Sequence, residues 1–439
     1  MTMFTLFAGA MASKNRGTCL GRGIWGAILM LGSVTTPALA QNALTWQQIE
    51  DKFEAANPTL KAAKDNIDES RAEEVTAYLR PNPDFTISAD GTQIAPYQGA
   101  WRPFSGTFFS PAVSYLHERR HKRELRLESA RETTAVTQST YFDQERNLLF
   151  TLRSAFVQVL QAKAVRENAQ ENLAYWDHEL TINKQRLDAG DMAQVDYDRL
   201  VLQRAQFESD FETATVSLRT AKIQLLQLLN DRTPIEQFDV TGPFKAGGQL
   251  MPLEKFREEA LATRPDLKAA VQSVDLAKTN YDLAVANGST DPTFSVWYTH
   301  NGSFNNPDAY NTLGASINIP LRIFDRNQGE KARTLIDIRR SERLRDAAQA
   351  QVFNDVDSAY VTLVGAANLL KPYETLYLEL AAGTRNRVSF AYEHGGASLL
   401  DYLDAEKSFR DTRLAYLNLV GSYLTAAAQM NLAVGREIM

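Results

Sequence analysis

Two residue patterns in this sequence have the types and spacing that chemistry requires. The segment His117-Glu118-Arg119-Arg120-His121 satisfies the HExxH pattern, in which two histidines one helical turn apart hold zinc and the glutamate acts as the base. The second pattern is Ser398-x-x-Asp401, followed by Asp404, directly after the glycine pair Gly395-Gly396. This spacing is that of a helix capping box, in which acidic residues favour the first turn of the helix. Capping explains Asp404 least well, because Asp404 lies beyond the first turn.

The HExxH segment lacks the surroundings that a catalytic zinc needs. Such a site requires a third protein ligand and a dry cleft, whereas this segment lies at a predicted strand-to-helix junction within a run of basic residues. The equivalent segment of the second half, 322–328, contains no histidine. The pattern therefore favours a solvated basic cluster at the junction, with a periplasmic zinc protease as a distant alternative.

The first 40 residues have the pattern of a cleaved secretory signal. Three basic residues precede an apolar run over 24–34, and Ala38-Leu39-Ala40 is typical of a cleavage site. We therefore predict a signal peptide at 1–40. No later run has the apolar length of a membrane-spanning helix, so we expect strands to make any membrane crossing.

Charge and cysteine content exclude several classes of function. Loss of the signal removes three basic and no acidic residues, so the formal net charge changes from −6 to about −9. This balance argues against a nucleic-acid partner. The single cysteine, Cys19, leaves with the signal, which excludes disulfides, thiolate metal sites and thiol catalysis in the mature chain.

Several short segments recur in the same order at an offset of about 205 to 209 residues. They are Asn57-Pro58-Thr59-Leu60 with Arg264-Pro265-Asp266-Leu267, Asn82-Pro83-Asp84-Phe85 with Asp291-Pro292-Thr293-Phe294, and Val195-Asp196-Tyr197 with Leu400-Asp401-Tyr402. Such regular recurrence predicts a duplicated unit. We predict a first repeat over 41–245 and a second over 246–439.

The first repeat contains a stretch suited to very long helices. The 122 residues between Pro111 and Pro234 contain no proline and one glycine, Gly190. We therefore predict a helical hairpin over about 119–230 with its tip near Gly190. Apolar residues recur along its first arm at steps of three and four: Leu148, Leu152, Ala155, Val159, Ala162, Val165, Ala169, Leu173, Trp176 and Leu180. An arm of about 105 Å is too long for the interior of a globular domain.

The second repeat follows the same plan with two interruptions. We predict its hairpin over about 328–434, with the tip at Gly395-Gly396. Gly365 and Pro372 lie within the first arm, and each is expected to kink or break the helix.

Strand candidates precede each hairpin, over about 84–95 and 106–116, and over about 292–301 and 311–320. Apolar and small polar residues alternate along them, and aromatic residues lie near their ends, as in outer-membrane barrel strands. Four strands cannot close a barrel, so several chains would have to contribute. The alternative is a soluble four-stranded sheet covered by helices.

This combination of duplication, paired strands and glycine-centred tips resembles the TolC-like outer-membrane efflux channels over essentially all of 44–434. The resemblance implies a mainly α fold with a small β part. Such channels are homotrimers in the cell outer membrane, with a shared twelve-stranded transmembrane β-barrel and a hollow helical tunnel in the periplasm. The run Ile319-Pro320-Leu321-Arg322-Ile323-Phe324-Asp325-Arg326-Asn327-Gln328-Gly329-Glu330 is similar to the subgroup that serves cobalt-zinc-cadmium and related heavy-metal pumps.

The resemblance also implies a periplasmic gate at the hairpin tips. Asp401 and Asp404 match the positions of the family's pore-narrowing acidic rings, and Tyr392 matches a tyrosine of its closing bond network. Asp196 matches the acidic partner in the first repeat. Ala397 replaces an arginine of the best-studied member, so we expect a different latch. Three like charges around one axis would repel one another and attract cations.

The implied function is that of a passive exit duct in a tripartite efflux pump, with heavy-metal cations as the favoured cargo. The implied partners are a periplasmic adaptor, an inner-membrane RND-type transporter and outer-membrane lipid. We expect no enzyme activity and no cofactor, and opening would splay the hairpins about Gly190 and Gly395-Gly396. Asp191 and Gln194 resemble a cap at the first tip, so capping and gating can coexist. A type I protein-secretion or drug-efflux duct is the alternative.

Overall fold

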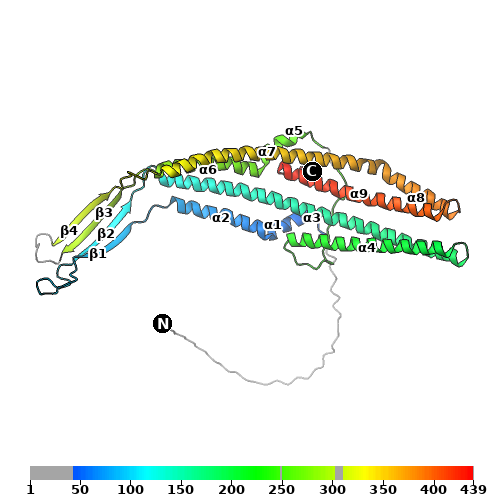
Figure 1. Cartoon of the computed structure of the whole chain (residues 1–439), viewed down its shortest axis with the longest axis horizontal. Helices are drawn as coiled ribbons and strands as arrows, with labels where there is room; N and C mark the ends of the chain where they lie inside the picture. Colours follow the sequence, from blue (N-terminus) through cyan, green and yellow to red (C-terminus); the bar gives the residue numbers. More distant parts are fainter. Residues whose placement is uncertain (1–42, 248–249, 302–309, 439) are drawn as a thin grey trace, which may run out of the picture. The chain divides into compact units, whose positions relative to one another are not determined.

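The computed structural model describes residues 43–247, 250–301 and 310–438, and the predicted signal peptide lies outside these residues. The elements of the first half are α1 (Trp46–Ala56), α2 (Pro58–Tyr78), β1 (Asp84–Asp90), β2 (Phe108–Leu116), α3 (Lys122–Asp188) and α4 (Gln194–Leu228). The second half contains α5 (Leu253–Thr263), α6 (Pro265–Asn287), β3 (Thr293–Asn301), β4 (Asn311–Asn318), α7 (Gln328–Pro372), the π-helical turn η2 (Tyr373–Tyr377), α8 (Leu378–Glu393) and α9 (Leu399–Val434). The strands lie at one end of the long helices and the two hairpin turns at the other (Figure 1).

The short helices begin where local chemistry favours a helix start. Thr45 and Gln48 form a capping box at the start of α1. Asn57 caps α2 by accepting a hydrogen bond from the Leu60 backbone N–H at 3.0 Å, and Pro58 occupies the first helical position. The Arg264-Pro265 pair starts α6 at the corresponding place, without a side-chain cap.

The first hairpin confirms the predicted seam. Along α3, Leu152, Ala155, Val159, Ala169 and Trp176 are buried, and the other members of the seam are partly buried. One window of α3 is also long and apolar enough for a membrane span. Because α3 packs along α2, α4, α6 and α9, its apolar stripe is instead explained by helix packing.

The second hairpin has one of its two predicted interruptions. Pro372 ends α7, and the π-helical turn η2 follows before the chain continues as α8. A proline lacks the N–H that an α-helical hydrogen bond needs, which accounts for the irregular turn there. The helix does not break at Gly365, because α7 continues through this residue, and a glycine alone weakens a helix without ending it.

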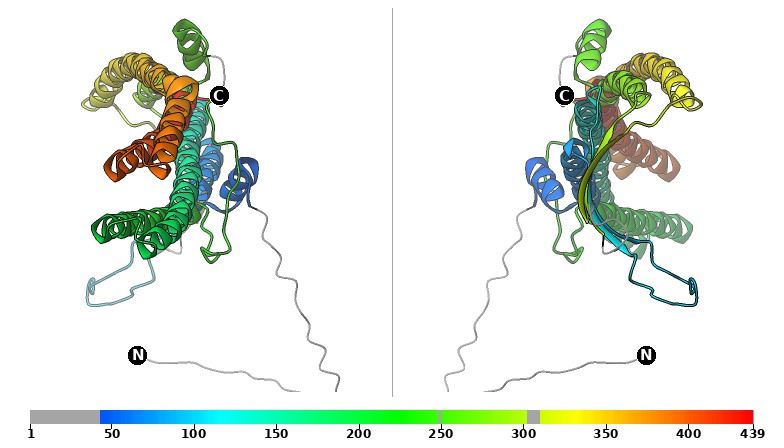
Figure 2. Two further views of the ribbon diagram at one scale, coloured as in Figure 1. Left: turned by 90° about the vertical axis from the view of Figure 1, so that its right-hand side faces the viewer. Right: turned by 90° about the vertical axis from the view of Figure 1, so that its left-hand side faces the viewer.

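The four strands form one antiparallel sheet in the order β1-β2-β3-β4. Seen from the strand end of the helices, this sheet forms a curved layer (Figure 2). β1 ends at Asp90, earlier than predicted, because the chain turns at Gly91, whose φ is +75°. β4 ends at Asn318, just before Pro320, which cannot donate to a neighbouring strand.

The two faces of the sheet differ in chemistry, as the strand register shows. One face carries Phe85, Ile87, Phe109, Val113, Tyr115, Phe294, Val296, Tyr298, Leu313 and Ile317. The other carries mainly small polar residues, together with Phe108 and Trp297: Thr86, Ser88, Ser110, Ser114, Ser295, Thr299, Thr312 and Ser316. This alternation of apolar and polar residues is that of a barrel wall with lipid on one side and water on the other.

Three apolar clusters hold the helices together. The first joins α1 to the middle of α3 and the end of α4, around Phe53, Leu152 and Leu225. The second joins α5, α7 and α9 around Phe256 and Met430. The third lies near the hairpin turns and joins α3 and α4 to α8 and α9. The two hairpins therefore contact each other at the end where the sequence predicts a gate.

Candidate functional site

Each hairpin turns through one glycine in the left-handed conformation. The φ angle is +84° at Gly190 and +73° at Gly395. The next residue closes each turn, since Asp191 N–H donates to the Arg186 carbonyl at 2.8 Å and Gly396 N–H to the Ala391 carbonyl at 2.7 Å. These bonds define Schellman turns, in which glycine is favoured at the left-handed position. Gly396 has no positive φ, so the left-handed turn requires only the first glycine of the pair.

The start of α9 carries a complete capping box. Asp401 N–H donates to Ser398 Oγ at 3.2 Å, and Asp401 Oδ2 accepts bonds from the Ser398 hydroxyl at 2.6 Å and from its backbone N–H at 3.1 Å. These bonds lower the pKa of Asp401 below its ordinary value. Asp401 Oδ1 has no hydrogen-bond partner among the described residues. Asp401 therefore caps the helix and still presents an acidic oxygen to solvent.

The first tip has no matching cap. Ala193 is the N-cap residue of α4 and makes no side-chain bond. The predicted cap by Asp191 and Gln194 is therefore wrong. Gln194 Nε2 donates instead to Asp198 Oδ1 at 2.8 Å, along the exposed face of α4.

Tyr392 lies inside the contact between the two hairpins. Its ring stacks on Tyr402 with centroids 4.9 Å apart, and its hydroxyl donates to Asn183 Oδ1 at 3.5 Å. The Arg186 guanidinium lies 5.3 Å from the ring centroid. Burial raises the pKa of the Tyr392 hydroxyl. Tyr392 on α8 thus contacts the end of α3 through a hydrogen bond to Asn183 and a cation–π contact with Arg186.

The acidic candidates lie outside this contact. Asp196, in the first turn of α4, pairs with Arg199 at 3.3 Å. Asp404 lies one turn after Asp401 on α9, is exposed and has no ion-pair partner among the residues that the structure describes. The structure therefore brings Asp401 and Asp404 to one exposed stretch of α9, and it gives Asp196 a different partner from Tyr392.

Sequence reasoning missed the buried carboxylate of the tip, Glu406. Tyr175 donates to Glu406 Oε1 at 3.3 Å, the Tyr175 and Tyr402 hydroxyl oxygens lie 3.2 Å apart, and Arg385 lies 4.0 Å from the carboxylate. Burial raises the pKa of Glu406 to about 7. The signal was present, because Leu399, Tyr402 and Glu406 follow one another at steps of three and four along α9.

Three aromatic rings form the apolar side of the same contact. The Tyr402 ring lies between Trp176 and Tyr392, with nearly parallel planes and a centroid distance of 6.1 Å to Trp176. Trp176 Nε1 donates to the Leu200 carbonyl at 3.0 Å. The stack therefore ties α3, α4, α8 and α9 together close to the two turns.

The HExxH segment does not have the geometry of a zinc protease. Residues 117–121 precede α3, and Arg120 and His121 both have positive φ angles, so the two histidines do not lie one helical turn apart. Glu118 is held by Arg126 in a two-bond ion pair. Among the described residues, no group of three or more His, Cys, Asp or Glu is arranged to hold a metal ion. The structure thus contradicts the protease alternative for this segment.

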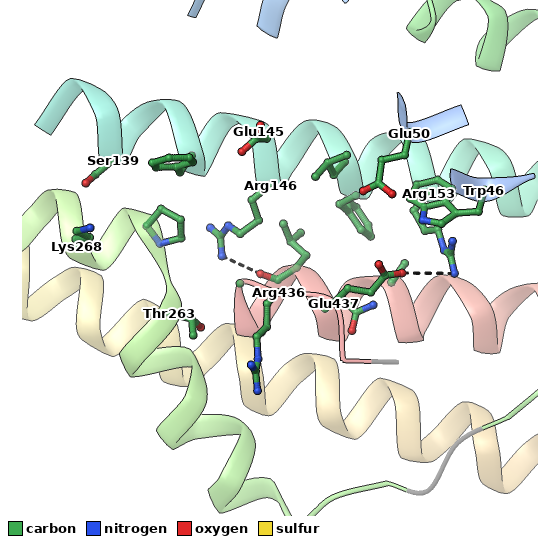
Figure 3. A pocket seen from close by; sticks show the side chains of 18 residues that line it. Trp46, Glu50, Ser139, Glu145, Arg146, Arg153, Thr263, Lys268, Arg436 and Glu437 are labelled. Carbon is green, nitrogen blue, oxygen red and sulfur yellow. Dashed lines mark hydrogen bonds and ion pairs between the residues drawn. The ribbon is translucent and has the colours of Figure 1, made fainter. Parts of the chain in front are cut away.

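A cavity lies beside the first apolar cluster, with Trp46 and Leu149 in its wall (Figure 3). It has a volume of about 380 Å³ and is bounded by α1, α3, the start of α6 and the end of α9. Two of its arginines contact the end of the chain: Arg146 donates to the Leu432 carbonyl at 2.8 Å, and Arg153 lies 3.9 Å from Glu437. These bonds join α3 to the end of α9, which gives the cavity wall a role in holding the two repeats together.

Most of each repeat matches one protein family. The model of the outer membrane efflux protein family matches residues 51–231 and 256–436. The chain belongs to this family. It is therefore an outer-membrane efflux channel, and its family and fold are those of passive channels. The helices of this channel lie in the periplasm and its strands in the outer membrane.

Individual relatives agree with this assignment. The cobalt-zinc-cadmium resistance protein CzcC of Cupriavidus metallidurans is 24% identical over 414 residues, which cover 91% of this chain and 92% of CzcC. Crystal structures of CusC match with a TM-score of 0.75 and 18% identity, over 89% of this chain and 92% of CusC. The open-state MtrE channel of Neisseria gonorrhoeae matches with a TM-score of 0.72 and 18% identity, over 89% of each chain. These structural matches establish the fold of this channel.

Proposed function

We propose that this channel is the homotrimeric exit duct of a tripartite pump for heavy-metal cations. Three chains would each contribute β1 to β4 to one twelve-stranded barrel. A periplasmic adaptor would join the helical tunnel to an inner-membrane RND-type transporter, which supplies the energy. The free edges of the outer strands β1 and β4 suit pairing with neighbouring copies.

The observation that carries the proposal is the exposed acidic pair on α9. Asp404 has no ion-pair partner among the described residues, and Asp401 retains a free oxygen. Around a threefold axis each residue forms a ring of three carboxylates, which attracts cations where the tunnel narrows. The likeness to CzcC, a cobalt-zinc-cadmium resistance protein, supports metal cations as the cargo.

Gating would use the contact between the hairpins. In the proposed closed state Tyr392 holds α8 against α3. The ion pair of Asp196 and Arg199 lies in the first two turns of α4, beside this contact. Opening would separate the hairpins about their turns at Gly190 and Gly395-Gly396, because packed helices slide more readily than barrel strands separate. We also propose cleavage after residue 40 and repeat boundaries at 41–245 and 246–439.

Planar-bilayer conductance of the mature protein tests the acidic rings. We expect discrete channels that divalent cations block from the periplasmic side, and weaker block after Asp401→Asn with Asp404→Asn. Ser398→Ala is the matched control, because it weakens the helix cap by about 1 kcal/mol and keeps all the charges. If divalent cations block the double variant as strongly as the wild type, the two aspartates do not form a cation site and act only in the structure of the helix.

The cargo is tested in cells that lack the chain. Loss of cobalt, zinc or cadmium tolerance, with protein export and drug tolerance unchanged, is the expected result. Loss of export or drug tolerance with normal metal tolerance would instead assign the duct to type I secretion or drug efflux.

A further inference from the structure

The apolar face of the sheet continues into a basic pocket at the end where the strands meet the helices. Tyr115 lies on the same face as Val113 and opposite Phe294 in the register of β2 and β3. The His117 ring lies edge-on to Phe294, with centroids 6.4 Å apart. In an outer-membrane channel this apolar face contacts lipid. Tyr115 and His117 therefore mark the lipid side of the junction.

The pocket has a volume of about 530 Å³ and is lined mainly by charged side chains. Besides Tyr115 and His117, its walls comprise Arg80, which precedes β1, and residues 118–124, which form the end of the β2–α3 connection and the first turn of α3. This position follows directly after the apolar strand band. In the periplasmic leaflet it corresponds to the level of the lipid headgroups.

Part of the charge in this pocket is already neutralised. Arg126 pairs with Glu118, and Lys122 is buried and pairs with Asp291 at 2.5 Å. Arg123 pairs with Glu124 at 3.0 Å. These pairs fix the junction between β2, β3 and α3.

Two further arginines of the pocket form no such pairs. Arg80 and Arg120 are exposed, and neither has a hydrogen bond or an ion pair to another residue that the structure describes. Arg120 has a φ of +62°, which shows that the junction holds a non-glycine residue in a costly backbone conformation. Two guanidinium groups therefore stand free beside the lipid-facing aromatic residues.

We infer that this pocket binds the phosphate headgroup of a phospholipid in the periplasmic leaflet of the outer membrane. Guanidinium groups bind phosphate oxygens in two-bond geometry, and their apolar stems can lie against the lipid-facing surface. Tyr115 and Phe294 continue that surface toward the acyl chains. Continuity with the lipid-facing band favours a membrane lipid over a soluble anion. The inference depends on the membrane location and is independent of the proposed cargo.

Lipid binding to the purified full channel tests the inference. Phosphatidylglycerol with short acyl chains is titrated into the channel in a neutral detergent, and bound lipid is counted by native mass spectrometry. We expect Arg80→Gln with Arg120→Gln to weaken binding about 30-fold, since each cation beside a membrane contributes roughly fivefold. The control is Arg232→Gln with Arg339→Gln, which removes two exposed arginines away from the strands.

The outcomes separate the possible ligands. Unchanged binding in the double variant, or an equal loss in the control, overturns the inference. Diacylglycerol binding as tightly as phosphatidylglycerol would show that only acyl chains are recognised. Inorganic phosphate that competes at equal concentration would assign the pocket to a free anion. If the double variant does not fold, Arg120→Lys and Arg120→Gln are compared, and retention of binding by the lysine variant alone supports a headgroup site.

Discussion

We predict that Glu406 makes the contact between the two hairpins dependent on pH. Burial raises the pKa of this carboxyl from its ordinary value of 4.5 to about 7. The groups that face it are Tyr175 and Glu179 on α3, Arg385 on α8 and Tyr402 on α9. Burial also raises the pKa of Glu179. The titration of Glu179 therefore changes the stability of the contact in the same direction as that of Glu406 and does not cancel it.

The direction of the effect follows from proton linkage. The packed tip binds the Glu406 proton more tightly than the separated tip does, so packing is favoured below pH 4.5 and weakened as the pH rises through 7. The full difference of about 2.5 pKa units corresponds to about 3 kcal/mol, or roughly 300-fold in the closing equilibrium. Between pH 5.5 and pH 8 the same values predict about a 30-fold loss of closure, near 2 kcal/mol.

Hydrogen exchange of backbone amides measures this loss. Peptides from the first turns of α9 are compared at pH 5.5 and pH 8, with intrinsic exchange rates corrected and peptides from the end of α9 as the internal reference. We expect protection of the tip to fall about 30-fold in the wild type. Glu406→Gln should remove most of this fall, because the neutral amide can still accept the Tyr175 hydrogen bond.

A matched variant separates this carboxyl from general effects of charge. Glu171 is an exposed residue of α3 that pairs with Arg413, and Glu171→Gln should leave the pH dependence unchanged. The reasoning is refuted if Glu406→Gln keeps the wild-type pH dependence, or if protection of the tip increases as the pH rises.

Two further predictions concern the turn and the second repeat. Gly395→Ala should destabilise the tip by about 1 kcal/mol because its φ is +73°, whereas Gly396→Ala should be tolerated, and equal thermal shifts would contradict this difference. Arg264→Met should lower the free energy of unfolding by about 3 kcal/mol, because Arg264 is buried and its loss removes the ion pairs with Asp266 and Asp355. Arg257→Met, which breaks the more exposed pair with Asp357, should cost under about 1 kcal/mol in the same urea titration, and similar losses would count against burial as the cause.

Local patterns predicted much of the fold because they act over a few residues. The near absence of proline and glycine between Pro111 and Pro234 predicted α3 and α4, and the three- and four-residue steps through Leu152 and Trp176 predicted which side of α3 is buried. The strand pairs were predicted from alternation, with errors at the ends, where a turn at Gly91 ended β1 early.

Pairings between distant segments were beyond this reasoning. Within one chain Asp196 pairs with Arg199 and Tyr392 bonds Asn183, and the part of both residues in a gate stays a prediction. The HExxH segment was predicted to be a solvated basic cluster at a strand-to-helix junction, and the structure places it in the non-helical junction before α3. Spacing along a chain specifies a face only after the backbone conformation is known.

The sequence by itself determined the duplication, the long helices, the strands and the left-handed turn glycines, because periodicity and backbone preference are properties of neighbouring residues. The tertiary structure alone decided that Glu406 is buried beside Tyr175 and that Arg80 and Arg120 line one pocket. Burial and electrostatic environment arise when segments far apart in the chain pack together, and they set the pKa values and free charges on which function depends.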